Sequence, residues 1–274
     1  RTREHFVPYL SWAAQPTIID SGLGRLLETA AHAKDDFVSL LPALDVPLAT
    51  GDARLPSRRI ADQGEVNACF SCALATCLEA RDPAMPALSA LFHFHYAAQL
   101  WPGAADRGIS DETIAYGALR EHGISAARLH PYPITRANVD RNPSSVALSD
   151  AATRIPKMND NGQSPWAPQF SGPMCDVRWK AALARRQPVL LILYTNHAYW
   201  DLNNGGVDTW KSTDREIGSQ LHAAAIIGSS EERQAFIVQD SRGPGFGVGG
   251  QWFLPYELAG GAAIEASFTL EYEE

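Results

Sequence analysis

The stretch Asp62-Gln-Gly-Glu-Val-Asn-Ala-Cys69-Phe-Ser-Cys72-Ala is the most informative part of the chain. Gln63 stands six residues before Cys69, and the run that Cys69 opens contains no Gly or Pro until Arg81-Asp-Pro83. This pattern predicts a helix with Cys69 in its first turn. The partial positive charge at a helix N-terminus favours a thiolate, which is the nucleophilic form of cysteine.

Length and composition are those of an ordinary globular protein. The chain has 274 residues, enough for one large or two modest domains with a full hydrophobic core. Hydrophobic residues make up 45% and charged residues 20%, and no segment approaches the roughly 18 to 20 apolar residues of a membrane span. The net charge is -8, and no cluster of Lys and Arg is interleaved with aromatics. We therefore expect a soluble protein with no membrane partner and no nucleic-acid partner.

The cysteine pattern does not indicate a disulfide framework or a zinc site. Only four cysteines are present, and Cys69, Cys72 and Cys77 lie within nine residues of one another. Structural zinc sites draw on two separated pairs of ligands, and only one pair exists here, so we expect no metal and no cofactor. We interpret Cys72 and Cys77 as buried apolar residues. This usage weakly favours a reducing compartment, but the chain starts at Arg1 and not at Met, so secretion is not excluded.

The chain divides into an extension and a two-part body. Residues 1–54 contain one amphipathic helix, Gly24–Ala33, followed by several prolines. We interpret them as an N-terminal extension, either a structural arm or a segment that regulates the body. In the body, residues 55–274, helices are predicted for about 60–160 and mainly strands for about 161–274. The fold class is therefore α+β, with a helical first lobe and an antiparallel, barrel-like second lobe.

The predicted elements are delimited by turn residues. In the first lobe, helices are expected at Cys69–Ala80, Leu88–Leu100 and Ser110–Glu121, with Ser110 as N-cap and Gly123 as the stop. In the second lobe, we expect a helix at Val177–Arg185 and strands at Pro188–Tyr194, Ala223–Ile227, Ala235–Gln239 and Gln251–Leu254. The stretch Gly245–Gly250 matches G-x-G-x-x-G, but it leads into a strand and not a helix, so we predict a glycine-rich hairpin.

Two residues of the second lobe complement a thiolate at Cys69. His222 begins one apolar strand, and Asp240 ends the next. A tight turn between these strands pairs them antiparallel, which brings the start of one beside the end of the other. Asp240 can then accept a hydrogen bond from the His222 ring, as the orienting group of a general base does. Gln63 and the backbone N–H of Cys69 offer donors for an oxyanion.

Three blocks of sequence resemble the signature blocks of the papain-like cysteine peptidases. They are Asp62-Gln-Gly through Cys69-Phe-Ser, Leu221-His-Ala-Ala-Ala-Ile-Ile-Gly228, and Gln239-Asp-Ser-Arg-Gly243 through Gly250-Gln-Trp-Phe. Leu88-Ser-Ala-Leu-Phe-His and Gly108-Ile-Ser-Asp-Glu-Thr further resemble the bacterial members. The resemblance implies a papain-like fold with the active-site cleft between two lobes. It also implies Cys69 as nucleophile, His222 as general base and acid, Gln63 as oxyanion donor and Asp240 as the residue that orients His222.

Two positions depart from the family pattern. The family usually has Asn where this chain has Asp240; a carboxylate accepts the same hydrogen bond from imidazole, and its charge favours a thiolate-imidazolium pair. A Trp that normally shields this pair is replaced by Arg242. We therefore expect either a more exposed contact between Asp240 and His222 or an ion pair between Arg242 and Asp240.

The resulting hypothesis is a cysteine peptidase that hydrolyses peptide or isopeptide bonds of a protein or peptide substrate through a Cys69 acyl-enzyme. One alternative is an amidase, transamidase or acyltransferase that uses the same residues. The other is a catalytically silent papain-like binding module. The sequence predicts neither the preferred cleavage site nor the oligomeric state.

Three other features of the sequence fit this hypothesis less directly. A redox role for the C-x-x-C of Cys69 and Cys72 leaves the remaining signature blocks unexplained. His197 is an alternative base, but nothing after it resembles an orienting residue. His93 and His95 fall within a predicted helix, where we expect them at the edge of the core.

Overall fold

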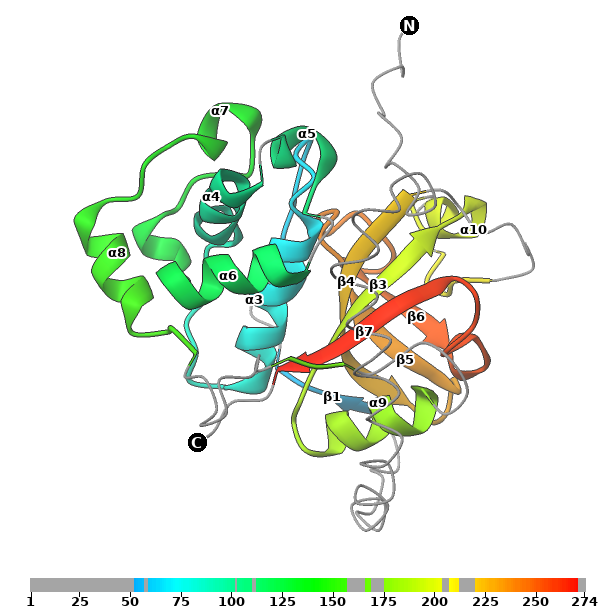
Figure 1. Ribbon diagram of the computed structural model, residues 1–274. Coiled ribbons are helices and arrows are strands. Elements are labelled where there is room, and N and C mark those ends of the chain that lie inside the picture. Colours follow the sequence, from blue (N-terminus) through cyan, green and yellow to red (C-terminus); the bar gives the residue numbers. More distant parts are fainter. Residues whose placement is uncertain are drawn as a thin grey trace, which may run out of the picture.

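The computed structural model describes residues 52–56, 59–101, 103–109, 112–156, 166–168, 175–203, 207–211 and 220–270. In this part of the chain, the helices of residues 69–152 form one lobe, and an antiparallel sheet forms the other (Figure 1). The predicted α+β class and two-lobed arrangement are confirmed. Within these ranges, no helix has the length and apolar character needed to cross a membrane. The helix predicted at Gly24–Ala33 and the N-cap predicted at Ser110 lie outside the described residues.

Helix α3 (Cys69–Arg81) lies between the two lobes. Its residues are buried from Cys69 to Ala80, because the helix packs against the sheet and also against the next helix of the helical lobe (Figure 1). A helix of mostly apolar residues without a polar face suits such an interior position. The prediction of a helix that Cys69 opens is therefore confirmed.

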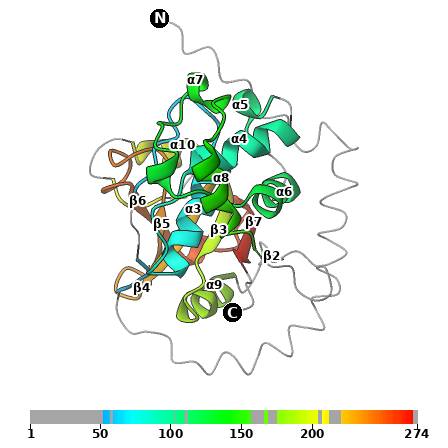
Figure 2. The ribbon, with the colours of Figure 1, turned by 90° about the vertical axis from the view of Figure 1, so that its left-hand side faces the viewer.

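The other helices of this lobe surround α3 on the side away from the sheet. Figure 2, seen from the helical side, shows several of them in front of the sheet. Hydroxyl groups cap two of them: Ser89 accepts a hydrogen bond from Phe92 N–H and Ser144 accepts one from Ala147 N–H, each at 3.2 Å. The bounds are α4 (Ala90–Leu100), α5 (Ala104–Arg107), α6 (Glu112–His122), the 3-10 turn η3 (Ala127–Leu129), α7 (Arg136–Val139) and α8 (Ser145–Ala152).

Two histidines of α4 lie deeper than the sequence suggested. His93 is 0% exposed and His95 is 5% exposed, so the expectation of histidines at the core edge is wrong. The Nε2–H of His93 donates to the Ala115 carbonyl at 2.8 Å, which leaves Nδ1 to accept from the Ser71 hydroxyl at 2.8 Å. Burial lowers the pKa of His93 to about 4. This histidine is therefore a neutral link between α3, α4 and α6.

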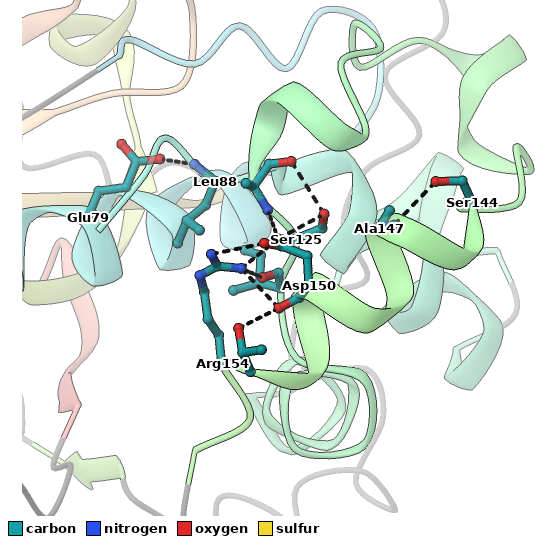
Figure 3. Close-up of polar contacts among 10 residues, drawn as sticks. Glu79, Leu88, Ser125, Ser144, Ala147, Asp150 and Arg154 are labelled. Carbon is teal, nitrogen blue, oxygen red and sulfur yellow. Dashed lines mark hydrogen bonds and ion pairs between the residues drawn. The ribbon is translucent and has the colours of Figure 1, made fainter. Parts of the chain in front are cut away.

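A charged network joins α8 to the segment that follows α6 (Figure 3). The Asp150 carboxylate accepts a hydrogen bond from Ala126 N–H at 2.7 Å and pairs with Arg154 at 2.6 Å. The guanidinium of Arg154 also donates to the Ile124 carbonyl at 3.4 Å. The two charged side chains are only 17% and 18% exposed, so water screens this pair less than it screens an ordinary surface pair.

In the described residues of the second lobe, seven strands form one sheet whose strand pairs are all antiparallel. The strand order is β2-β7-β3-β4-β5-β6, and β1 pairs with β4. The four predicted strands are present, whereas the three others were not predicted. The bounds are β1 (Asp52–Arg54), β2 (Trp166–Pro168), β3 (Val189–Thr195), β4 (Gln220–Ser230), β5 (Ala235–Gln239), β6 (Gln251–Pro255) and β7 (Ile264–Leu270), with helices α9 (Cys175–Ala184) and α10 (His197–Asp201) and the 3-10 turn η4 (Tyr256–Leu258).

Strand β4 is the central element of this sheet. It is flanked by β3 and β5, and both α3 and α9 pack against it. Its residues from His222 to Ser230 are buried, which explains the unbroken apolar run in the sequence. The pairing of β1 with β4 brings residues 52–54 into the sheet, while the division of the chain at residue 54 and a regulatory role for the extension stay predictions.

Gly123, at the end of α6, provides a test of the contact between α6 and α8. Its φ of +67° is left-handed, and a Cβ there would lie 2.0 Å from the carbonyl oxygen of Ala151. We expect Gly123→Ala to lower the free energy of unfolding by about 2 to 5 kcal/mol, because backbone strain and a clash add. Gly249 is the matched control: its φ is +63°, and no atom lies within 4 Å of the added Cβ. Urea unfolding should show that Gly249→Ala lowers the free energy of unfolding by only about 1 to 2 kcal/mol. Equal losses for the two variants would contradict the predicted clash.

Candidate active site

The thiol of Cys69 lies at the start of α3, where the two lobes meet. The N-cap residue Ala68 offers no side-chain cap to the first helical amides. Burial alone would raise the pKa of this thiol, but a hydrogen bond with His222, the charge of His222 and a hydrogen bond from the Ala223 backbone lower the pKa overall. The charge of Arg242 acts in the same direction. These interactions favour the thiolate form of Cys69.

The expected contact between His222 and Asp240 is present. The pairing of β4 with β5 aligns Ala225 with Gln239, which brings His222, near the start of β4, beside Asp240, just after β5. The Nε2 of His222 lies 3.0 Å from Oδ1 of Asp240. Because Nε2 of His222 is hydrogen-bonded to Asp240, the hydrogen bond between His222 and Cys69 uses the other ring nitrogen, Nδ1. The three side chains thus form a chain of hydrogen bonds across the lobe interface.

The charge of Asp240 controls the protonation of His222. Burial would lower the pKa of His222, but the negative charge of Asp240 and the hydrogen bonds to Asp240 and Cys69 raise it to about 9. Burial would likewise raise the pKa of Asp240, but the charge of His222 and its hydrogen bond hold that pKa below its usual value. The imidazolium and the carboxylate therefore stabilise each other in a nearly fully buried position.

Four donors surround the carboxylate of Asp240. Oδ1 accepts hydrogen bonds from His222 and, at 2.8 Å, from the backbone N–H of Ser241. Oδ2 accepts from the Tyr199 hydroxyl at 3.1 Å and from Trp252 Nε1–H at 2.9 Å. Asp240 and His222 are each only 2% exposed, so the expectation of a more exposed contact is wrong. The shielding comes from α10 and β6.

Arg242 does not pair directly with Asp240, so that expectation is also wrong. Its Nε–H donates to the Tyr199 hydroxyl at 3.0 Å, and Tyr199 in turn donates to Asp240. Burial and the charge of Asp240 raise the pKa of Tyr199, which keeps this hydroxyl protonated between the two charges. The guanidinium carbon of Arg242 lies 4.3 Å from the centre of the Trp200 ring, a cation-π distance.

The amide of Gln63 is held in one orientation beside the site. Its Oε1 accepts a hydrogen bond from the Ser241 hydroxyl at 2.6 Å, and its Nε2 donates to the Val66 carbonyl at 3.1 Å. The backbone N–H of Gln63 also donates to the Ser241 carbonyl at 2.8 Å. An amide nitrogen carries two hydrogens, so one remains for another acceptor. Ser241 therefore ties the predicted oxyanion donor to the residue that follows Asp240.

Sequence reasoning missed Tyr199 and Trp252, which complete the shell of Asp240. In the sequence, the segment that contains Tyr199 offers only His197 as a candidate site residue. The structure places His197 at the start of α10, where it is exposed. The signal that could have revealed Trp252 is its place at the start of a strand next to the one that Asp240 ends. A polar aromatic in such a position can reach a buried carboxylate across neighbouring strands.

The remaining cysteines lie in the core. Cys72, Cys77 and Cys175 are buried, and the interpretation of Cys72 and Cys77 as buried residues is confirmed. Burial raises the pKa of the Cys72 and Cys77 thiols, so neither shares the lowered pKa of Cys69. Among the described residues, no three His, Cys, Asp or Glu side chains gather in a way that could hold a metal ion.

The fold and this arrangement define the class of structure. The chain has the papain-like fold, with the cysteine of the helical lobe facing the histidine of the sheet lobe, as the sequence resemblance implied. The sequence itself matches no family model and no curated protein.

Solved cysteine protease structures share this fold. Xylellain, a cysteine protease from Xylella fastidiosa, has a TM-score of 0.68 at 18% identity, with 84% of this chain and 89% of xylellain covered. Digestive procathepsin L 3 from the larval midgut of Tenebrio molitor has a TM-score of 0.58 at 19% identity, with coverages of 81% and 70%. Procathepsin B S9 from Trypanosoma congolense has a TM-score of 0.58 at 16% identity, with coverages of 85% and 80%.

The four donors around Asp240 predict that Asn is a poor substitute here. In Asp240→Asn the amide oxygen can keep the bonds of Oδ1, but its NH₂ then faces Trp252 Nε1–H, which only donates. We expect urea unfolding to show a loss of about 1 to 3 kcal/mol. NMR titration should also show the pKa of His222 falling from about 9, because the carboxylate charge is lost.

A second substitution separates this mechanism from general damage. Trp252→Phe removes the competing donor, so the double variant Asp240→Asn/Trp252→Phe should be more stable than the sum of the two single losses predicts. Strict additivity of the two losses would contradict the proposed conflict between donors.

Proposed function

We propose that this protein is a cysteine peptidase that cleaves peptide or isopeptide bonds through an acyl-enzyme on Cys69. The observation that carries the proposal is the buried series Cys69, His222 and Asp240, in which the thiol pKa is lowered and the imidazole pKa is raised. Such opposite shifts in neighbouring groups mark an acid-base pair prepared for catalysis. The papain-like fold supports the same conclusion, because solved structures that share it include cysteine proteases.

In the first half of the proposed reaction, the Cys69 thiolate attacks the carbonyl carbon of the substrate. A bond forms between Sγ and this carbon, and the carbonyl electron pair moves onto the oxygen. When the tetrahedral intermediate collapses, the bond between carbon and nitrogen breaks. His222 supplies its Nδ1 proton to the leaving nitrogen, so the amine departs neutral and the acyl group stays on Cys69.

In the second half, water resolves the thioester. Neutral His222 accepts a proton from the water, whose oxygen bonds to the acyl carbon. The bond to Sγ then breaks, the carboxylic acid leaves, and the thiolate and imidazolium are restored. Asp240 forms a hydrogen bond with His222 and takes no direct part in these steps. Its role is therefore to orient the imidazole ring and to stabilise the positive charge of that ring.

The oxyanion would be held by two donors that the fold fixes in advance. One is the backbone N–H of Cys69 at the start of α3, and the other is the free hydrogen of Gln63 Nε2. Ser241 keeps the Gln63 amide from flipping, because its hydroxyl binds Oε1. Donors that are already oriented need no rearrangement when charge develops on the oxygen.

Selective alkylation tests the nucleophile. We expect iodoacetamide to label folded protein at Cys69 alone, because the pKa of Cys72 and of Cys77 is raised by burial. Peptide mapping by mass spectrometry should show no label in Cys69→Ala and an unchanged label in Cys72→Ala, the matched control. Cys69→Ala should also lose all cleavage of a peptide library. Turnover retained by this variant would overturn the proposal, and failure of the folded wild type to label would favour a silent binding module.

The same peptide library distinguishes hydrolysis from acyl transfer. With an added primary amine, a hydrolase should still release mainly carboxylic acids, whereas a transferase should release mainly amides of the added amine. Predominant amide formation at low amine concentration would replace the peptidase assignment with that of an acyltransferase.

The activity should depend on pH in a bell-shaped manner. As the pH rises through the lowered pKa of Cys69, the thiolate forms and kcat/KM increases. As it rises further through about 9, His222 loses the proton that the leaving nitrogen needs, and kcat/KM decreases. A pH series of kcat/KM measures both limbs. An acidic limb at the pKa of an ordinary thiol would contradict a preformed thiolate-imidazolium pair.

A further inference from the structure

A small hollow opens beside the candidate active site. Its volume is about 180 Å³. Its lining consists of residues 62–64, which include the proposed oxyanion donor Gln63, together with Trp200, Asn203, Arg242 and Phe246. The hollow therefore adjoins both the oxyanion donor and the segment that follows Asp240.

Arg242 brings a positive charge to the lining of this hollow, and this charge is offset only at a distance, because Tyr199 lies between Arg242 and the Asp240 carboxylate. Its Nε–H is used by the neutral hydroxyl of Tyr199, and its guanidinium lies against the Trp200 ring. Within the described parts of the chain, the structure contains no ion pair between Arg242 and a carboxylate. An arginine that is held in place by Tyr199 and Trp200 but makes no direct ion pair can bind an incoming carboxylate.

Asp62, the acidic residue in the lining of the hollow, does not neutralise Arg242 through an ion pair. Asp62 also lines the hollow, but its Oδ1 accepts a hydrogen bond from Gly64 N–H at 2.9 Å and makes no ion pair with Arg242. Asp62 therefore stabilises the turn that carries Gln63. Because Asp62 carries a negative charge, the hollow could instead favour a substrate with a basic group. This second outcome can be tested against a preference for an acidic group that Arg242 would bind.

The chemistry of the proposed reaction indicates which part of the substrate reaches Arg242. The leaving nitrogen must lie next to His222, because His222 supplies its proton. Arg242 follows Asp240, the partner of His222, by two residues, and it shares its hollow with Gln63, the donor to the oxyanion. The chain that continues from the leaving nitrogen can therefore extend into the hollow, whereas the acyl part stays bonded to Cys69.

We infer that Arg242 selects substrates that carry a carboxylate on the leaving-group side of the scissile bond, an inference that rests on the proposed peptidase function. Two sources supply this chemistry. One is the side chain of Asp or Glu directly after the scissile bond, and the other is the free C-terminal carboxylate of a leaving residue. The stacking on Trp200 and the bond to Tyr199 restrict the guanidinium before the substrate binds, which lowers the entropy lost on binding.

Four peptides that share the same acyl part and differ only in the leaving residue test the inference. Their leaving residues are Glu with an amidated C-terminus, Gln with an amidated C-terminus, Gln with a free C-terminal carboxylate, and Lys with an amidated C-terminus. We expect kcat/KM for at least one of the two carboxylate-bearing peptides to exceed that for amidated Gln by about tenfold or more, the range of a hydrogen bond between charged groups. The peptide that gains identifies the source of the carboxylate.

Variants assign this preference to Arg242. Arg242→Met should reduce the ratio between the preferred peptide and amidated Gln to about one, and Arg242→Lys should retain part of it because the charge remains. The ratio is the appropriate measure, because Arg242 also acts on the Cys69 thiol and any change there affects both peptides equally. Arg185→Gln is the matched control: it removes one positive charge from an exposed residue after α9, outside the hollow, and should leave the ratio unchanged.

The outcomes separate this inference from the proposed function. Cleavage that ignores the leaving residue, a preference for Lys, or a ratio that survives Arg242→Met would each overturn the role of Arg242 while leaving the peptidase proposal intact. If Cys69 fails to label with iodoacetamide and none of the peptides is cleaved, the proposed function fails, and the role of Arg242 fails with it.

Discussion

The buried pair of His222 and Asp240 is the interaction on which the rest of the site depends. Removing two charges from water is costly, and an ion pair in the interior is stable only when its remaining hydrogen-bonding groups are satisfied. Ser241, Tyr199 and Trp252 satisfy the carboxylate of Asp240, and the Cys69 thiol lies at the other side of the ring. The register of β4 and β5, the position of α10 and the first turn of α3 must all be correct for this pair to exist.

The arrangement of the two lobes follows from the same requirement. The thiol comes from a helix that is buried on nearly all sides, and the imidazole comes from a strand that lies at the centre of a sheet. Both elements are rigid, because close packing in a protein interior leaves little room for movement. The distance between Cys69 and His222 is therefore set by the packing of α3 on β4 and not by a flexible loop.

The positions of the candidate catalytic residues could be predicted from the sequence better than their surroundings. Cys69, His222 and Asp240 could be related to one another because a helix start and two paired strands follow from local patterns. Tyr199 and Trp252 could not, because each reaches Asp240 from an element whose position depends on the whole sheet. The replacement of a shielding Trp by Arg242 suggested exposure, but the two other aromatic residues cover the carboxylate. Strand β7 was missed as well, since alternation such as that of Ile264–Leu270 is weak in a buried sheet.

The sequence by itself determined the α+β class, the helix that Cys69 opens and the antiparallel pairing that joins His222 to Asp240. These features depend on hydrophobic periodicity and on short turns, which are local properties of the chain. Only the tertiary structure decided that Asp240 is buried among four donors, that Arg242 meets it through Tyr199, and that Arg242 and Gln63 line one hollow. The reason is physical: side chains from α10, β5 and β6 meet there only after the sheet has formed, and no local pattern encodes contacts between residues so far apart in the chain.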